Sequence, residues 1–134
     1  MSMPDTPKQT FRKAERLCSK KRIEQLFAGS NHSFAAYPLR TIYMECAESK
    51  APAEVLISVS KRHFKHAVDR NRVKRLVRES YRKNKHILID NLQGKRVSLA
   101  FIWMGGNLIP YTVVEAKVKN LLQRIAEHIK EDGQ

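Results

Sequence analysis

The chain has 134 residues, of which 42% are hydrophobic, so it can build one modest core and wholesale disorder is not expected. Lys and Arg number 26 against 13 Asp and Glu, which gives a formal net charge of +13. A compact domain with this charge repels itself, and a polyanion would relieve the repulsion. Nucleic acid is the leading partner because its binding releases counterions, and an anionic membrane surface is the weaker alternative.

Several classes of protein are excluded by what the sequence lacks. There is no apolar run of about 18 residues, so we expect no membrane-spanning helix. The opening MSMPDTPKQTFRK has no apolar segment of the kind found in secretory signals. Two cysteines, Cys18 and Cys46, are too few for a disulfide scaffold or a cysteine-rich zinc site, and they fit a reducing, cytoplasmic location.

The first ten residues hold two prolines and few apolar side chains, and we expect a flexible basic arm over residues 1–10. Residues 11–130 are predicted to form a single α/β domain, followed by a short tail at 131–134. A helix is predicted to begin at an N-cap, Ser19, and to end near Gly29. Its apolar side would carry Ile23, Leu26 and Phe27.

Residues 30–38 resemble a loop, with room for one short strand. Residues 39–46 and 53–60 are rich in β-forming side chains and predict two strands. The polar connection between them suits a hairpin. In the second strand, Val55, Ile57 and Val59 are expected on one face.

A helix is predicted over roughly residues 68–84, because apolar positions recur there at intervals of three and four. Its apolar stripe consists of Val73, Leu76, Val77, Ser80 and Tyr81. Its opposite side carries Asn71, Arg75, Arg78 and Arg82. The helix is therefore expected to pack on one side and to present cations on the other.

A turn at 91–95 precedes residues 96–103, which are nearly all apolar and predict a strand buried on both faces. A loop follows, and Thr112 with Glu115 fits a capping box that starts the last helix. The core stripe of that helix is Val114, Val118, Leu121, Ile125 and Ile129. The expected fold is α+β, a single two-layer sandwich with helices packed on a central, mostly antiparallel sheet.

The positive charge is concentrated in one segment. Eleven Lys and Arg lie between Lys61 and Lys85, opposed only by Asp69 and Glu79. Guanidinium groups grip phosphates through a planar fork of donors. A solvated helix face normally pairs acids with bases four residues apart, and the acids are mostly missing here. A binding surface is therefore favoured over a merely solvated one.

Catalytic motifs are absent from the sequence: it has no phosphate-binding loop, no nucleophile elbow and no cluster of carboxylates for Mg²⁺. His63 and His66 form the only close histidine pair, and a metal-free nuclease could use two histidines as acid and base. We favour the simpler interpretation that they are turn residues or face RNA, since no orienting carboxylate is evident.

The segments 58–62 (SVSKR), 67–68 (AV) and 70–78 (RNRVKRLVR) together resemble the signature of the bacterial ribonuclease P protein component. Chain length, basic N-terminus and element order agree over roughly residues 10–130. The resemblance implies a protein subunit that helps a catalytic RNA to remove the 5′ leader from precursor tRNA. It also implies that Mg²⁺ is bound by that RNA, that the protein itself holds no cofactor and no small-molecule substrate, and that the crossover around the basic helix is left-handed.

The resemblance further implies two sets of contact residues. The set facing the catalytic RNA is Lys61, Arg62, Lys65, Arg70, Asn71, Arg72, Lys74, Arg75, Arg78 and Arg82. A cleft for the single-stranded leader maps to Ile23, Phe27 and Tyr43, with core packing as the alternative for Ile23 and Phe27. Ile23 stands where the family often has an aromatic residue, and residues 103–106 (WMGG) stand where it often has basic ones. A structural RNA-binding protein of the ribosomal type remains the alternative function.

Overall fold

The computed structural model describes residues 15–28 and 32–132. In this part of the chain the elements follow in the order α1 (Lys20–Leu26), β1 (His32–Ala36), β2 (Leu39–Glu45), β3 (Ala53–Val59), α2 (Ala67–Asn84), α3 (His86–Ile89), β4 (Val97–Trp103) and α4 (Tyr111–Asp132). The division into an arm at 1–10, a domain at 11–130 and a tail at 131–134 stays a prediction. The arm and Gly29 lie outside the described residues, and α4 continues as far as Asp132.

The four strands form one sheet in the order β1-β2-β4-β3. β2 pairs antiparallel with both β1 and β4, while β3 and β4 run parallel. The short strand allowed for near residues 30–38 is present as β1. The predicted hairpin between residues 39–46 and 53–60 is wrong, because β4 lies between those two strands. β4 is almost continuously apolar. Its central position gives it a neighbouring strand at each edge and lets helices cover both of its faces.

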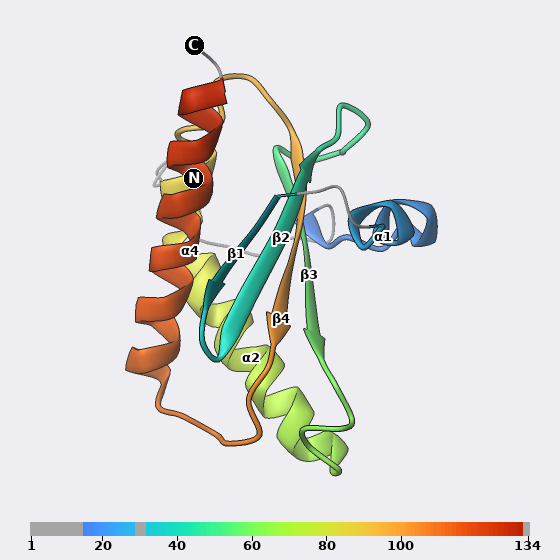
Figure 1. Ribbon diagram of the computed structural model, residues 1–134, viewed down its shortest axis with the longest axis vertical. Coiled ribbons are helices and arrows are strands. Elements are labelled where there is room, and N and C mark those ends of the chain that lie inside the picture. The colour runs from blue at the N-terminus through green and yellow to red at the C-terminus, as the bar shows by residue number, and fades with distance from the viewer. Residues whose placement is uncertain (1–14, 29–31, 133–134) are drawn as a thin grey trace, which may run out of the picture.

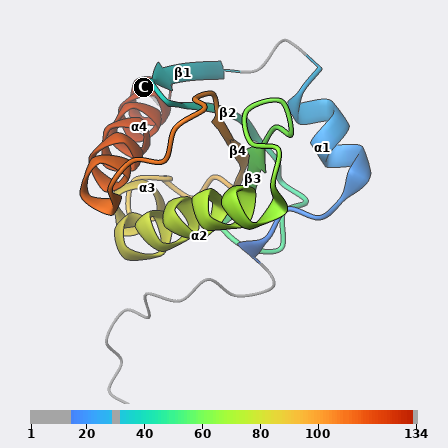
Figure 2. The same ribbon diagram turned by 90° about the horizontal axis from the view of Figure 1, so that it is seen from below.

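Helices cover the two faces of the sheet unequally (Figures 1 and 2). α2, α3 and α4 lie on one face, where they enclose the main core together with Leu99, Phe101 and Trp103 of β4. α1 lies on the other face, where Leu26 packs against Ala100. The predicted two-layer sandwich is therefore correct for the main core, and α1 adds a partial third layer.

The connection from β3 through α2 to β4 joins two neighbouring parallel strands. In Figure 1 both strands point downwards, α2 lies behind the sheet and β4 lies to the left of β3, so the crossover is left-handed. Such connections are right-handed in about 98% of cases. Only the family resemblance predicted this unusual hand.

The apolar stripes predicted for the two long helices are buried as expected. Val73, Val77, Ser80 and Tyr81 of α2 are fully enclosed and Leu76 is partly buried. The whole predicted stripe of α4 is enclosed. Ser19 caps α1 by accepting a hydrogen bond from the Arg22 backbone N–H at 3.3 Å. In the described part of the chain, no helix is long and apolar enough to cross a membrane.

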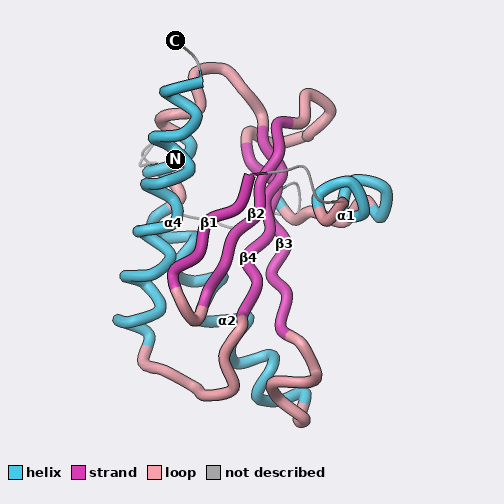
Figure 3. The backbone as a smooth tube through the Cα atoms, in the orientation of Figure 1, coloured by secondary structure: helices cyan, strands magenta, loops and turns pink. Residues whose placement is uncertain are grey.

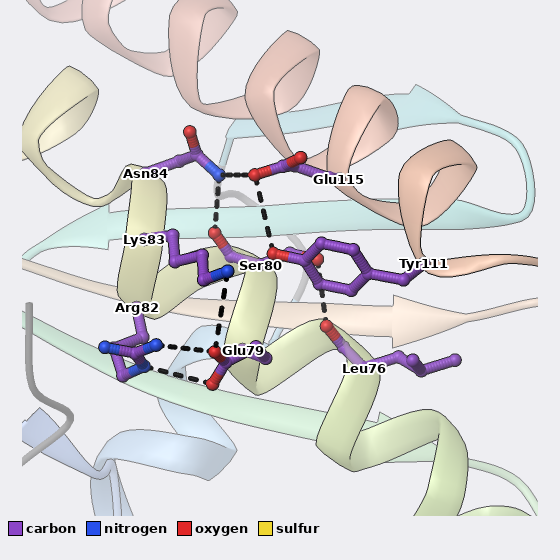
Figure 4. A network of polar contacts seen from close by, with 8 residues as sticks. All are labelled: Leu76, Glu79, Ser80, Arg82, Lys83, Asn84, Tyr111 and Glu115. Carbon is purple, nitrogen blue, oxygen red and sulfur yellow. Dashed lines mark hydrogen bonds and ion pairs between the residues drawn. The ribbon is translucent and has the colours of Figure 1, made fainter.

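The capping box predicted at Thr112 and Glu115 is wrong. α4 begins at Tyr111, and the carbonyl of Pro110 already accepts from the backbone N–H groups of residues 113 and 114. Thr112 is thus an exposed residue inside the first turn. The Glu115 carboxylate instead accepts from Asn84 at 3.0 Å and from the Tyr111 hydroxyl at 3.4 Å, which ties α4 to α2 (Figure 4).

A buried ion pair fixes α1 to the edge of the sheet. Arg22 of α1 donates to the Glu54 carboxylate of β3 at 2.6 Å, and the Glu54 side chain is only 4% exposed. The backbone N–H of Lys50 donates to the same carboxylate at 3.3 Å. A buried carboxylate is stable only with such partners, so the position of α1 depends on this pair.

Replacing Arg22 with Met should therefore destabilise the fold while keeping the apolar stem of the side chain. We expect the free energy of unfolding to fall by about 3 kcal/mol, because breaking a buried pair leaves one charge uncompensated. Urea denaturation measures the change. Lys21→Met, which removes a neighbouring exposed cation, is the matched control and should change stability by less than about 0.5 kcal/mol. Equal stability of the two variants would contradict the anchoring role of Arg22.

Candidate nucleic-acid interface

α2 turns its apolar stripe toward α4 and the sheet, so its cations lie on the remaining sides. Arg72 and Arg75 are exposed, and Lys74 and Arg78 are half-buried. Among the described residues, none of these four side chains forms an ion pair with a carboxylate, and the ion pairs within α2 join Glu79 to Arg82 and Lys83 near its C-terminal end. This surface therefore carries positive charge that the protein does not neutralise internally.

Arg82 differs from the other cations of α2 because it is already engaged. Its guanidinium donates to both oxygens of Glu79, with Nε to Oε1 at 3.0 Å, and Lys83 lies 4.0 Å from the same carboxylate (Figure 4). The hydrogen bond from Arg82 holds the pKa of Glu79 below its usual value. Glu79 is therefore charged at neutral pH and competes with any external anion for Arg82.

Arg70 is engaged differently, through backbone oxygens. Its Nη1 donates to the carbonyl of Phe64 at 2.8 Å and to that of Lys65 at 3.1 Å. These bonds hold the turn at residues 60–66 against the first turn of α2. Lys61, Arg62 and Lys65 in this turn are exposed, as is Asn71 on the helix. Arg70 thus positions other predicted contact residues as well as adding charge.

Lys74 and Arg78 line a pocket of about 230 Å³ at the outer edge of β3. The segment before α1 closes the pocket. Arg16 forms an isolated parallel β-bridge with Val55, and the Leu17 backbone N–H donates to the Val55 carbonyl at 2.9 Å. The other lining residues are Arg16, Leu17, Cys18, Val55, Leu56 and Ile57. The pocket combines cationic walls with an apolar floor, a composition suited to a nucleotide.

On the α1 side of the sheet, a partly exposed apolar surface lies next to this pocket. We call it the α1-side surface, and it consists of Ile23, Ile42, Met44, Leu56 and Ile102, together with Phe27 at the C-cap of α1, whose backbone N–H donates to the Ile23 carbonyl. Phe27 is the most accessible aromatic side chain there, with 44% of its surface exposed. The leader cleft predicted at Ile23 and Phe27 stays a prediction, and the two residues lie one helical turn apart at the end of α1.

The structure does not bring Tyr43 to this surface. Side chains alternate along β2, and Tyr43 points to the α4 side, where it is 2% exposed and its hydroxyl hydrogen-bonds to Nδ1 of His128. Its neighbours Ile42 and Met44 occupy the α1 side instead. Both sets of alternate positions in β2 mix apolar and polar side chains, so the sequence gives no clear signal for which set faces α1.

His63 and His66 lie in the turn before α2, with His66 at the N-cap position but making no side-chain cap bond. Among the described residues, no group of three or more His, Cys, Asp or Glu is placed to hold a metal ion. Around α2 and α1 the arrangement is thus cationic and apolar. The His32 and His128 rings lie 4.2 Å apart beside Tyr43, on the α4 side of the sheet.

A model of the ribonuclease P family matches residues 11–126. The chain belongs to the ribonuclease P protein family. The ribonuclease P protein component of Porphyromonas gingivalis is 42% identical over 120 residues, which cover 87% of each chain. That of Chlorobium phaeobacteroides is 30% identical over 129 residues, covering 87% of this chain and 88% of the relative.

Two solved ribonuclease P proteins share the fold. The protein from Thermotoga maritima superposes with a TM-score of 0.67 at 23% identity, covering 82% of this chain and 96% of that one. The protein from Staphylococcus aureus gives a TM-score of 0.69 at 20% identity, covering 84% and 96%. The family resemblance inferred from the signature is therefore confirmed, and with it the fold class.

The engagement of Arg82 by Glu79 leads to a prediction about RNA binding. Glu79→Gln should release Arg82 and raise the affinity for RNA, and the slope of log affinity against log salt should steepen by about one unit if Arg82 then contacts a phosphate. Filter binding over a range of salt concentrations measures both quantities. Glu127→Gln on α4 makes the same change in charge without releasing a cation of α2 and is the control. Identical slopes for the two variants would show that Arg82 does not face RNA.

Proposed function

We propose that this protein is the RNA-binding subunit of ribonuclease P and acts in the cytoplasm. It binds the catalytic RNA and the 5′ leader of precursor tRNA, and thereby assists the removal of the leader. Hydrolysis belongs to the RNA and its Mg²⁺, and the protein holds no cofactor. Family membership supports the role in tRNA processing, and the surface of α2 supports the role in RNA binding.

The observation that carries the proposal is the unneutralised charge of α2. Arg72 and Arg75 are exposed and lack a carboxylate partner in the described structure, while the helix beneath them is locked into the core. A row of guanidinium groups on a fixed helix suits a folded polyanion, because the backbone that carries them needs no further ordering on binding. We assign this outer row, with the turn at residues 60–66, to the catalytic RNA.

The leader is assigned to the other side of the molecule. The α1-side surface presents Phe27 for base stacking, and the adjoining pocket presents Lys74 and Arg78 for phosphates. Single-stranded RNA is commonly bound by this combination of an aromatic surface and a cationic track. Lys74 and Arg78 would thus lie where the leader and the catalytic RNA meet on the protein.

Reconstitution tests the function as a whole. The protein should lower the Mg²⁺ concentration at which the ribonuclease P RNA from the same genome cleaves precursor tRNA, whereas the protein alone should not cleave. Arg75→Ala should weaken RNA binding and reduce the salt slope by about one unit.

If the protein left the Mg²⁺ requirement unchanged, and ribosomal RNA co-purified with it from cells, the alternative of a ribosomal-type RNA-binding protein would replace the proposal. Cleavage by the protein alone that is lost on changing His63 and His66 to Ala would instead indicate a protein nuclease.

The leader assignment makes opposite predictions for two aromatic residues. Phe27→Ala should weaken binding of leader-bearing precursor tRNA by about tenfold, the loss expected for one stacked base, and should leave binding of mature tRNA unchanged. Tyr43→Phe removes the hydroxyl that contacts His128 and should not alter leader binding, because Tyr43 lies on the α4 side. Affinities of the assembled holoenzyme for the two RNAs measure the difference. A larger effect for Tyr43→Phe than for Phe27→Ala would contradict the assignment, because it would show that the leader binds on the α4 side of the sheet.

A further inference from the structure

Tyr37 is the most exposed aromatic side chain in the described structure, with 69% of its surface accessible. It lies in the turn between β1 and β2, at the lower end of the sheet in Figure 3. The turn at residues 60–66 and the loop at 104–110 reach the same end. A single exposed aromatic residue is ordinary on a protein surface, so its surroundings decide whether it has a role.

Tyr37 is seated on the loop that follows β4. A Cβ atom added at Gly105 would lie 3.3 Å from the Tyr37 hydroxyl and 3.1 Å from Cβ of Pro38. The Met104 backbone N–H also donates to the Pro38 carbonyl at 2.7 Å, which joins the turn to the loop. The hydroxyl end of the ring is thus held against a bare glycine while most of the side chain stays open to solvent. We call Tyr37, Pro38 and Gly105 the Tyr37 platform.

Cations lie on the other side of the same loop. A Cβ atom at Gly106 would lie 3.7 Å from the carbonyl oxygen of His63, so the loop abuts the turn at residues 60–66. That turn carries the exposed side chains of Lys61, Arg62 and Lys65. A presented aromatic ring and a group of phosphate-binding cations therefore flank one short loop.

We propose that an unpaired nucleotide of the ribonuclease P RNA stacks on Tyr37 while neighbouring phosphates contact the turn at residues 60–66. The proposal rests on the proposed function and adds a contact to it. Every base presents a π face that can stack on an aromatic ring, and an RNA strand supplies phosphates beside its bases. A second copy of this chain is disfavoured as the occupant because each carries a formal charge of +13.

The position of the platform selects the catalytic RNA over the leader. Arg22 ties α1 to Glu54 at the start of β3 and lies close to Cys46, just after the end of β2. The platform lies at the opposite end of the same strands, next to the start of β2 and the end of β4. The platform thus adjoins the cations assigned to the catalytic RNA, at the far end of the sheet from the ion pair that fixes α1.

Binding of the ribonuclease P RNA by Tyr37 variants tests the proposal. Tyr37→Ala should weaken binding by about tenfold at fixed salt. The salt slope should not change, because no charge is lost. Tyr37→Phe should bind as the natural protein does, since the ring carries the contact. Equal affinity for Tyr37→Ala and the natural protein would overturn the proposal, and so would a Phe variant as weak as the Ala variant.

The adjacent glycines offer a matched pair. Gly105→Ala crowds Pro38 and the Tyr37 hydroxyl, so it should displace the ring and weaken RNA binding. Gly106→Ala makes only an ordinary contact with the His63 carbonyl and should bind RNA normally. Equal affinities for these two variants would contradict the platform.

Arg75→Ala separates failure of the platform from failure of the proposed function. If Arg75→Ala weakens RNA binding and lowers the salt slope while Tyr37→Ala does neither, the platform fails and the RNA-binding function stands. If neither variant changes binding, both fail. A Tyr37→Ala effect confined to leader-bearing precursor tRNA would overturn the choice of RNA. A concentration-dependent dimer that Tyr37→Ala abolishes in sedimentation would identify the platform as a protein interface instead.

Discussion

β4 has an apolar side chain at every position except Ser98, and a strand of this kind is stable only where both of its faces are covered. The sheet satisfies this requirement by placing β4 between β2 and β3, with α2 and α4 on one face and α1 on the other. The chain must then leave β3, cross the sheet and return beside it. The crossing element is α2, which carries the arginine-rich surface. The need to bury the uncharged strand β4 therefore determines where that surface lies.

The same helix shows which physical effect dominates. Like charges three or four residues apart on a helix cost about 0.2–0.5 kcal/mol per pair. Burying a large apolar side chain contributes about 1.5–3 kcal/mol, and α2 buries Val73, Val77 and Tyr81 completely. Burial therefore exceeds the repulsion, and α2 keeps its cations without acids beside most of them. A polyanion bound to α2, as the proposed function requires, would remove the cost that remains.

Sequence periodicity predicted what depends on local spacing. The stripes of α2 and α4 follow from the intervals between apolar residues, and the doubly buried strand follows from a nearly continuous apolar run. Strand order was not predictable. β2 and β3 follow one another in sequence, but in the sheet β4 lies between them, and β4 comes some forty residues after β3. The face of Tyr43 was not predictable because both alternating sets in β2 mix apolar and polar side chains. The predicted capping box is wrong because Pro110 caps the first turn of α4. The signature identified the cations but could not show that Arg70 and Arg82 have internal partners.

These internal partners determine how many cations of the protein are available to pair with RNA phosphates. Lys85 is held by Glu15 at 2.6 Å, Arg82 by Glu79, and Arg70 lies against two carbonyl groups. A count of RNA-binding cations taken from composition alone would treat all three as equal to Arg72 or Arg75. Relatives with the same total of Lys and Arg can thus differ in how strongly ionic strength governs their assembly, according to where each places its few carboxylates.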